Sequence, residues 1–349
     1  MPSLYETLLP LIQAINEEGG NFSAFHLSKP VLDAIDIGGE TDQDLGRIRG
    51  KISEKIAACN GKRDHAGFSQ IFEAYTEGVI YLVVTRKKGM RISALPDGGK
   101  HGKTPDFATT TDLPIGLEVK TINVFDPVRT LDRAMDLGFE VSYAARERSL
   151  AEAAKSGRGI GFAEITFSPH GEGADPKDAV EQTIKKVRGN VKAGQYEARP
   201  TLLVLSLVRL GVHQNSCHLR QYLDIDEDCD VAPSGHLFAI AANRLENPYF
   251  DYSSRYYGVR DLGPLSEAGV LRDHSGIAGI VFLETIWHCS DDQNVIQTGF
   301  RFNGVWNTDW DSGDRFTREQ KTEAKNVFLQ LCDSWNDTEN ARAHLLPGQ

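Results

Sequence analysis

The hydrophobic and polar positions of this chain follow helical and strand-like periods in turn, and together they predict a mixed α/β protein. An amphipathic pattern predicts a helix over residues 4–18, where Ser3 and Glu6 have the spacing of a capping box. Further helical patterns cover residues 42–58 and 65–89. We therefore expect the amino-terminal part of the chain to be helical.

Short strand-like segments follow these helices. Strands are predicted at residues 91–95, 104–109 and 115–121, and a polar loop separates the first from the second. The composition of residues 79–85, VIYLVVT, also suits a strand, so the end of the third helix stays open between the two states. The second and third strands are close enough in sequence to pair as a hairpin.

Longer elements alternate in the middle of the chain. Helices are predicted over residues 127–156 and after Asp175, with a strand between them at residues 161–168. The apolar stripe of the second of these helices consists of Val180, Ile184, Val187 and Val191. The run TLLVLSLVRL at residues 201–210 is almost continuously apolar, which is typical of a strand with helices on both faces.

The remaining part of the chain repeats this alternation. A helix is predicted near residues 235–245 and a second buried strand at residues 277–286. Thr317 and Gln320 form a capping box for a last helix. Its shared apolar face is expected to consist of Ala324, Val327, Phe328, Leu331 and Trp335. The fold class indicated by the whole pattern is α/β, with a mixed central sheet flanked by helices.

Length and composition set the expected organisation. The 349 residues are enough for one core with additions at both ends. We expect an amino-terminal helical region at residues 1–62, a core with insertions at residues 63–289, and a carboxy-terminal extension ending in a helix at residues 290–349. The 40% of hydrophobic and 25% of charged residues are ordinary for a soluble globular protein.

Charge and cysteine content narrow the function and the compartment. The formal net charge of -11 argues against strong nonspecific binding to nucleic acid, because such binding depends on basic residues that neutralise phosphates. It permits an active site built from carboxylates. The five cysteines are scattered, which indicates a reducing compartment, and we find neither a signal peptide nor an apolar run long enough to cross a membrane. We expect a cytoplasmic protein without a membrane partner.

The segment TPDFATTTDLPIGLEVKTI carries the strongest chemical signal. Alternate residues of a strand point to the same face, so Glu118 and Lys120 share one face while Leu117 and Val119 enter a core on the other. Pairing of the two predicted strands brings Asp106 beside them. Two carboxylates and one lysine in a small space are typical of a site for a hard metal ion.

The order of helix, strand, strand with Pro105-Asp106, strand with Glu118-Val119-Lys120, helix and strand resembles the PD-(D/E)XK nuclease superfamily. The resemblance covers roughly residues 66–210. It implies a restriction-endonuclease-like αβββαβ core and a Mg²⁺-dependent nuclease that hydrolyses phosphodiester bonds, with Mn²⁺ as a substitute ion. DNA is the favoured nucleic acid, and an endonuclease of a restriction, defence or repair system is the favoured role.

The resemblance also assigns roles to residues. It implies that Asp106, Glu118 and the backbone carbonyl of Val119 hold the metal ion, and that Lys120 either acts on the attacking water or serves as an electrostatic clamp on the phosphate. Members of the superfamily often add an acidic residue from the preceding helix. Glu77 is our first choice for this role and Glu73 our second, because Glu77 lies at the better distance from the first core strand.

Several alternatives stay open at this point. The charged hairpin could lie on the surface with its Glu-Lys pair exposed to solvent. The fold could be catalytically silent and act as an interaction module in a DNA-processing or defence complex, or the nuclease could act on RNA. The chain shows no clear dimerisation stripe, so both a homodimer and a subunit of a larger complex remain possible partners.

Two further groups of residues have both a functional and an ordinary interpretation. A basic helical face could contact nucleic acid or simply be solvated; it consists of Lys185, Lys186, Arg188 and Lys192. A turn-rich segment could bind zinc, although its spacing lacks a CxxC pair; it contains His213, Cys217, His218 and Cys229.

Overall fold

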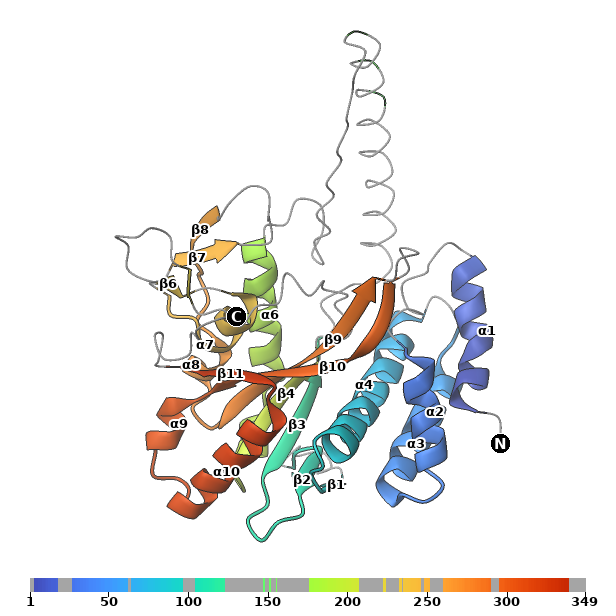
Figure 1. The fold of residues 1–349 in the computed structure, drawn as a ribbon, viewed down its shortest axis with the longest axis horizontal. Coiled ribbons are helices and arrows are strands. Elements are labelled where there is room, and N and C mark those ends of the chain that lie inside the picture. The colour runs from blue at the N-terminus through green and yellow to red at the C-terminus, as the bar shows by residue number, and fades with distance from the viewer. Residues whose placement is uncertain are drawn as a thin grey trace.

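The fold is that of a computed structural model. It describes residues 3–17, 27–61, 64–96, 104–122, 176–206, 235–245, 260–289 and 295–338, with short pieces at 222–223, 232–233 and 248–251 and the single residues 147, 151 and 155. Figure 1 shows a central sheet with helices on both of its faces. None of the helices in these ranges is long and apolar enough to cross a membrane.

Four helices form the amino-terminal region, as the periodicity predicts for three of them. They are α1 (Leu4–Glu17), α2 (Lys29–Gly38), α3 (Gln43–Ala58) and α4 (His65–Leu82). The capping box of α1 is present, because the Ser3 N–H donates to Glu6 Oε2 at 2.9 Å and the Glu6 N–H donates to Ser3 Oγ at 3.1 Å. Asp42 caps α3 by accepting the N–H groups of Asp44 and Leu45. The short helix α2 was not predicted.

The third predicted helix is confirmed, and the strand alternative for residues 79–85 is wrong. Helix α4 continues into a π-helical turn, η2 (Val83–Lys87). The helical segment then ends, and Gly89 follows with a φ of 65°. Gly78 lies where α4 packs on α2, and a Cβ there would stand 2.5 Å from Ile35 Cδ1. The glycine weakens the helix locally but permits this close approach, which outweighs its poor propensity.

A mixed sheet of seven strands occupies the centre of the molecule (Figure 1). Its strands, in spatial order, are β1 (Ile92–Ala94), β2 (Phe107–Thr109), β3 (Gly116–Thr121), β4 (Thr201–Ser206), β9 (Gly279–Cys289), β10 (Val295–Trp306) and β11 (Ser334–Asp337). The first three pair antiparallel, whereas β3, β4 and β9 are parallel. β10 pairs antiparallel with β9 and parallel with β11.

Two hydrophobic clusters cover the two faces of this sheet. Leu202 and Val204 of β4 belong to the cluster that packs under α1 to α4 and α10 (Arg318–Leu331). Leu203 and Leu205 belong to the cluster under α6 (Pro176–Asn190), α7 (His236–Ala242) and α8 (Val270–Asp273). All six residues of β4 are buried, which confirms the predicted central strand and explains its continuous apolar sequence.

The remaining elements are small. They are η4 (Ala193–Tyr196), a single 3₁₀ turn before β4, the pair β5 (Tyr222–Leu223) and β6 (Ala232–Pro233), the pair β7 (Pro248–Asp251) and β8 (Arg260–Pro264), and α9 (Thr308–Ser312). The predicted helix at residues 127–156 and the predicted strand at residues 161–168 lie outside the described residues, apart from three single positions.

The carboxy-terminal extension contributes β10 and β11 to the same sheet. The capping box before α10 is present, since Thr317 Oγ1 accepts the Gln320 N–H and Gln320 Oε1 accepts the Thr317 N–H. The assignment of Trp335 to the apolar face of this helix is wrong. The helix ends at Leu331 and Trp335 lies in β11, where its ring stands edge-on to Phe328 with 6.1 Å between the centroids. The four-residue spacing between Leu331 and Trp335 therefore matches a helical turn only by coincidence.

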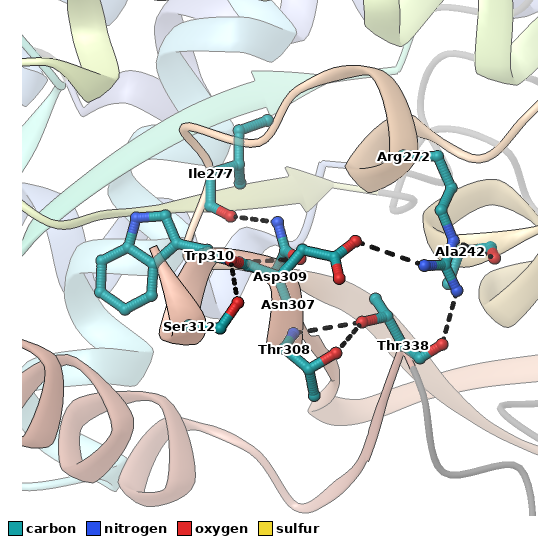
Figure 2. Close-up of polar contacts among 9 residues, drawn as sticks. All are labelled: Ala242, Arg272, Ile277, Asn307, Thr308, Asp309, Trp310, Ser312 and Thr338. Carbon is teal, nitrogen blue, oxygen red and sulfur yellow. Dashed lines mark hydrogen bonds and ion pairs between the residues drawn. The ribbon is translucent and has the colours of Figure 1, made fainter. Parts of the chain in front are cut away.

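Polar contacts fasten the ends of the sheet to the small helices (Figure 2). Asn307 Nδ2 donates to the Ile277 carbonyl at 2.9 Å, and Asn307 Oδ1 accepts the Trp310 N–H at the start of α9. Arg272 of α8 donates to the carbonyl of Thr338 at 2.6 Å. These contacts link the segment before β9 to the end of β10, and α8 to the end of β11.

Candidate functional site

The β2–β3 hairpin places Asp106 and Glu118 next to each other. Phe107 pairs with Leu117, so the residues one step further, Asp106 and Glu118, lie opposite each other with side chains on one face. Asp106 Oδ2 accepts the Val119 N–H at 2.7 Å. This bond fixes the Asp106 carboxylate at the edge of β3, as the predicted pairing requires.

Glu118 and Lys120 lie on the face that α6 covers. Glu118 is in register with Leu203 of β4. Leu203 belongs to the hydrophobic cluster under α6, α7 and α8, so Glu118 lies on that face of the sheet. Lys120 Nζ forms a short ion pair with Glu118 Oε1. The same oxygen accepts a hydrogen bond of 2.6 Å from Gln195 Nε2, in the turn η4. One oxygen of Glu118 therefore receives two donors, one of them charged.

Glu118 is buried, with 1% of its surface exposed. Burial, followed by the negative charge of Asp106, raises the pKa of Glu118 from an ordinary 4.5 to about 7, while Lys120 and Gln195 oppose the rise. The interpretation of this hairpin as a solvated surface feature is therefore wrong, because a surface Glu-Lys pair would leave both groups in water. The helices above the sheet face remove Glu118 from solvent.

Tyr196 completes the surroundings of the carboxylates. Its side chain is 2% exposed, and its hydroxyl finds no hydrogen-bond partner among the described residues. Burial raises the pKa of the Tyr196 phenol well above its ordinary value, and the charges of Glu118 and Asp106 raise it further. The phenol is therefore protonated and close to both carboxylates, where it is available as a donor.

Sequence reasoning missed both Gln195 and Tyr196. Gln195 is separated from Glu118 by 77 positions, and only the pairing of β4 with β3 brings its turn to the site. The available signal was an amide and an aromatic residue directly before a buried strand. That signal does not distinguish a site residue from an ordinary turn.

The structure does not bring the acidic residues of α4 into a metal cluster. Glu77 Oε1 forms an ion pair with Lys51 Nζ of α3 at 2.6 Å, and Glu73 is exposed. Among the described residues, no three His, Cys, Asp or Glu side chains form a group that could hold a metal ion. Neither Glu77 nor Glu73 therefore joins Asp106 and Glu118 in such a group.

The basic face of α6 is partly neutralised by acidic neighbours. Arg188 forms ion pairs with Glu267 and Asp273, and Lys185 lies 3.3 Å from Glu267. Lys186 and Lys192 are exposed on the same helix and just after it. The segment with His213, Cys217, His218 and Cys229 lies outside the described residues.

The donor atoms at the hairpin edge suit a hard cation. Mg²⁺ prefers oxygen ligands and usually takes one or two carboxylates together with several waters. The N–H and C=O of one residue point to the same side of a strand, so the Val119 carbonyl lies on the side of Asp106. Glu118 Oε2 is buried without a hydrogen-bond partner among the described residues, and a cation would satisfy it. Asp106, Glu118 and the Val119 carbonyl therefore fit Mg²⁺.

Comparisons with known proteins identify no relative of this chain. No protein-family model matches the chain, and no curated protein or solved structure matches it either. The class defined by the fold is that of α/β proteins with a mixed seven-stranded sheet between two layers of helices.

Proposed function

We propose that this protein is a Mg²⁺-dependent nuclease that hydrolyses phosphodiester bonds in DNA, and that it cuts as an endonuclease. The observation that carries the proposal is the pair of neighbouring carboxylates, Asp106 and Glu118, with Lys120 two positions further on the same strand face. A buried carboxylate with a pKa near 7 and an unsatisfied oxygen is uncommon in a purely structural hairpin.

The order and direction of the elements support the same proposal. Helix α4 precedes three antiparallel strands, β1 to β3, and helix α6 then leads to β4, which is parallel to β3. This is the order expected for the αβββαβ core of restriction-endonuclease-like nucleases. In that core the metal-binding carboxylates belong to the second and third strands, which here are the strands next to Asp106 and around Glu118.

The chemistry follows from the positions of the side chains. A bound Mg²⁺ would neutralise charge on the scissile phosphate and lower the pKa of a coordinated water. Asp106 and Glu118 would provide its negative ligands, and the Val119 N–H holds Asp106 in place. With a cation at Glu118, Lys120 would be available to the phosphate or the attacking water instead of its ion pair with Glu118. A lysine beside the reacting phosphate stabilises the charge that develops there.

A catalytically silent interaction module is the second candidate function. It is favoured by two observations, the ion pair that already occupies Lys120 and the lack of a third acidic residue at the site among the described residues. The formal net charge of -11 also suits a partner other than nucleic acid. This candidate requires neither metal binding nor hydrolysis, so one experiment separates the two.

The test is cleavage of supercoiled plasmid, linear duplex, single-stranded DNA and RNA with Mg²⁺, Mn²⁺ or EDTA. Wild type is compared with Asp106→Asn, Lys120→Ala and a control, Asp112→Asn, which alters an exposed aspartate in the same hairpin. We expect metal-dependent cutting of DNA by wild type and the control, and a loss of about 10²- to 10³-fold in both site variants.

Three other outcomes have a defined meaning. Cutting of RNA alone would replace DNA by RNA as the substrate. No cutting on any of these substrates, together with no heat of Mg²⁺ or Mn²⁺ binding in calorimetry, would refute the nuclease and support the interaction module. Equal cutting by wild type and Asp106→Asn would show that the activity belongs to another site or to a contaminant.

A further inference from the structure

The surroundings of Glu118 contain a side chain whose role goes beyond the three motif residues. Gln195 is 7% exposed and lies in the turn η4, which directly precedes the central strand β4. Its Nε2 donates to Glu118 Oε1 at 2.6 Å. Its backbone carbonyl accepts a hydrogen bond from Thr201 Oγ1 at 3.3 Å, which anchors the turn to the strand.

The pattern of satisfied and unsatisfied oxygens around this bond is asymmetric. Glu118 Oε1 receives Lys120 and Gln195, whereas Glu118 Oε2 and Gln195 Oε1 are buried and find no hydrogen-bond partner among the described residues. Each of these two oxygens belongs to the same carboxylate or amide group as an atom of the 2.6 Å bond. Buried oxygens that have no hydrogen-bond partner are costly unless another group satisfies them.

Carboxylate and amide oxygens are both ligands of hard cations, whereas neither of these oxygens can donate a proton to the other while Glu118 is ionised. A neutral amide also suits this position better than a second acid would, because it adds a donor to Glu118 without adding repulsion.

We propose that Gln195 is a positioning residue of the metal site, whose side-chain amide holds Glu118 Oε1 and so leaves Glu118 Oε2 for the cation. The inference rests on the proposed function, since it assumes that Asp106 and Glu118 bind a divalent cation. It adds a residue from outside the motif, and it makes the turn before β4 a part of the site.

The test is calorimetric titration with Mn²⁺ and Mg²⁺ of wild type, Gln195→Met, Gln195→Asn and the control Glu197→Gln, each checked for folding by circular dichroism and thermal unfolding. Methionine keeps the length of the side chain but cannot donate to Glu118. Asparagine keeps the amide but is one methylene too short, so it decides the question if the methionine variant fails to fold. Glu197→Gln changes an exposed side chain two positions further along and leaves the Gln195 amide in place.

We expect Gln195→Met to bind the cation about 10- to 100-fold more weakly than wild type, which is the usual effect of losing a group that orients a metal ligand. Gln195→Asn should also bind more weakly, and Glu197→Gln should bind as wild type does. Cleavage by Gln195→Met should recover when Mn²⁺ is raised to saturation, because positioning affects ion affinity more than the chemistry of the bound state.

The possible failures are distinguishable. Wild-type affinity in folded Gln195→Met and Gln195→Asn would overturn the inference alone. Metal binding that depends on Gln195 in a protein that cuts no nucleic acid would support the positioning role and refute the nuclease. A wild-type protein that binds neither Mn²⁺ nor Mg²⁺ would overturn both proposals.

Discussion

The burial of Glu118 predicts an unusual dependence of stability on pH. Because the pKa of Glu118 is raised to about 7 in the folded protein, mainly by burial, the folded state holds a proton that the unfolded chain releases near pH 4.5. The proton on Glu118 therefore stabilises the folded state fully below pH 4.5, and this stabilisation is lost as the pH rises through about 7. Replacing Glu118 by glutamine removes the titration altogether.

The magnitude follows from the two pKa values. One pKa unit corresponds to about 1.4 kcal/mol, so a change from 4.5 to about 7 corresponds to about 3 kcal/mol. We expect Glu118→Gln to gain about this much stability relative to wild type between pH 4.5 and 8 in EDTA. Loss of the ion pair with Lys120 shifts the stability of Glu118→Gln by a similar amount at every pH. It changes little in how the difference from wild type varies with pH, because glutamine does not titrate.

The assay is urea unfolding of both proteins at half-unit pH steps from 4.5 to 8. Only the difference between the two curves is interpreted, so that His274 and the other titrating groups cancel. Glu197→Gln, which changes an exposed glutamate close to the site, serves as the control and should give a nearly flat difference. Added Mg²⁺ should stabilise wild type at pH 8 and leave Glu118→Gln unchanged, because the ion replaces the proton on the buried carboxylate.

A Glu118→Gln difference curve as flat as that of Glu197→Gln would refute the reasoning. It would mean that water reaches Glu118 in solution, or that Lys120 compensates its burial fully. The argument for a cation at Glu118 Oε2 would then lose its physical basis.

Two further predictions concern the stability of the fold around the sheet. Arg272→Met should destabilise the fold by about 1 to 3 kcal/mol in chemical denaturation, because the Thr338 carbonyl loses its 2.6 Å hydrogen bond; an unchanged midpoint would show that water replaces the arginine. Gly304→Ala should lower stability by about 1 to 3 kcal/mol, because the new Cβ would clash with Cys332 Sγ and would stand 2.5 Å from Phe328 Cζ where α10 packs on β10. The combination of Gly304→Ala with Phe328→Leu should recover part of this loss in the same assay, and no recovery would place the strain at Cys332.

Much of the fold was predictable because its elements depend on local patterns. The capped helices α1, α3 and α10, the long helix α4 and the buried strands β4 and β9 all follow from spacing, capping residues and continuous apolar sequence. The short helix α2 and the strand β10 were missed. Strand β10 is held by its long pairing with β9, and only the paired strands reveal it.

The candidate site divides in the same way. The sequence by itself determined the Asp106, Glu118 and Lys120 hairpin, because a two-residue period and a short connection decide which side chains share a face. Only the tertiary structure decided that Glu118 is buried, that Glu77 turns to Lys51, and that Gln195 reaches the carboxylate. The physical reason is that burial and electrostatics depend on segments far away in the chain, which meet only when the strands pair and the helices close over them.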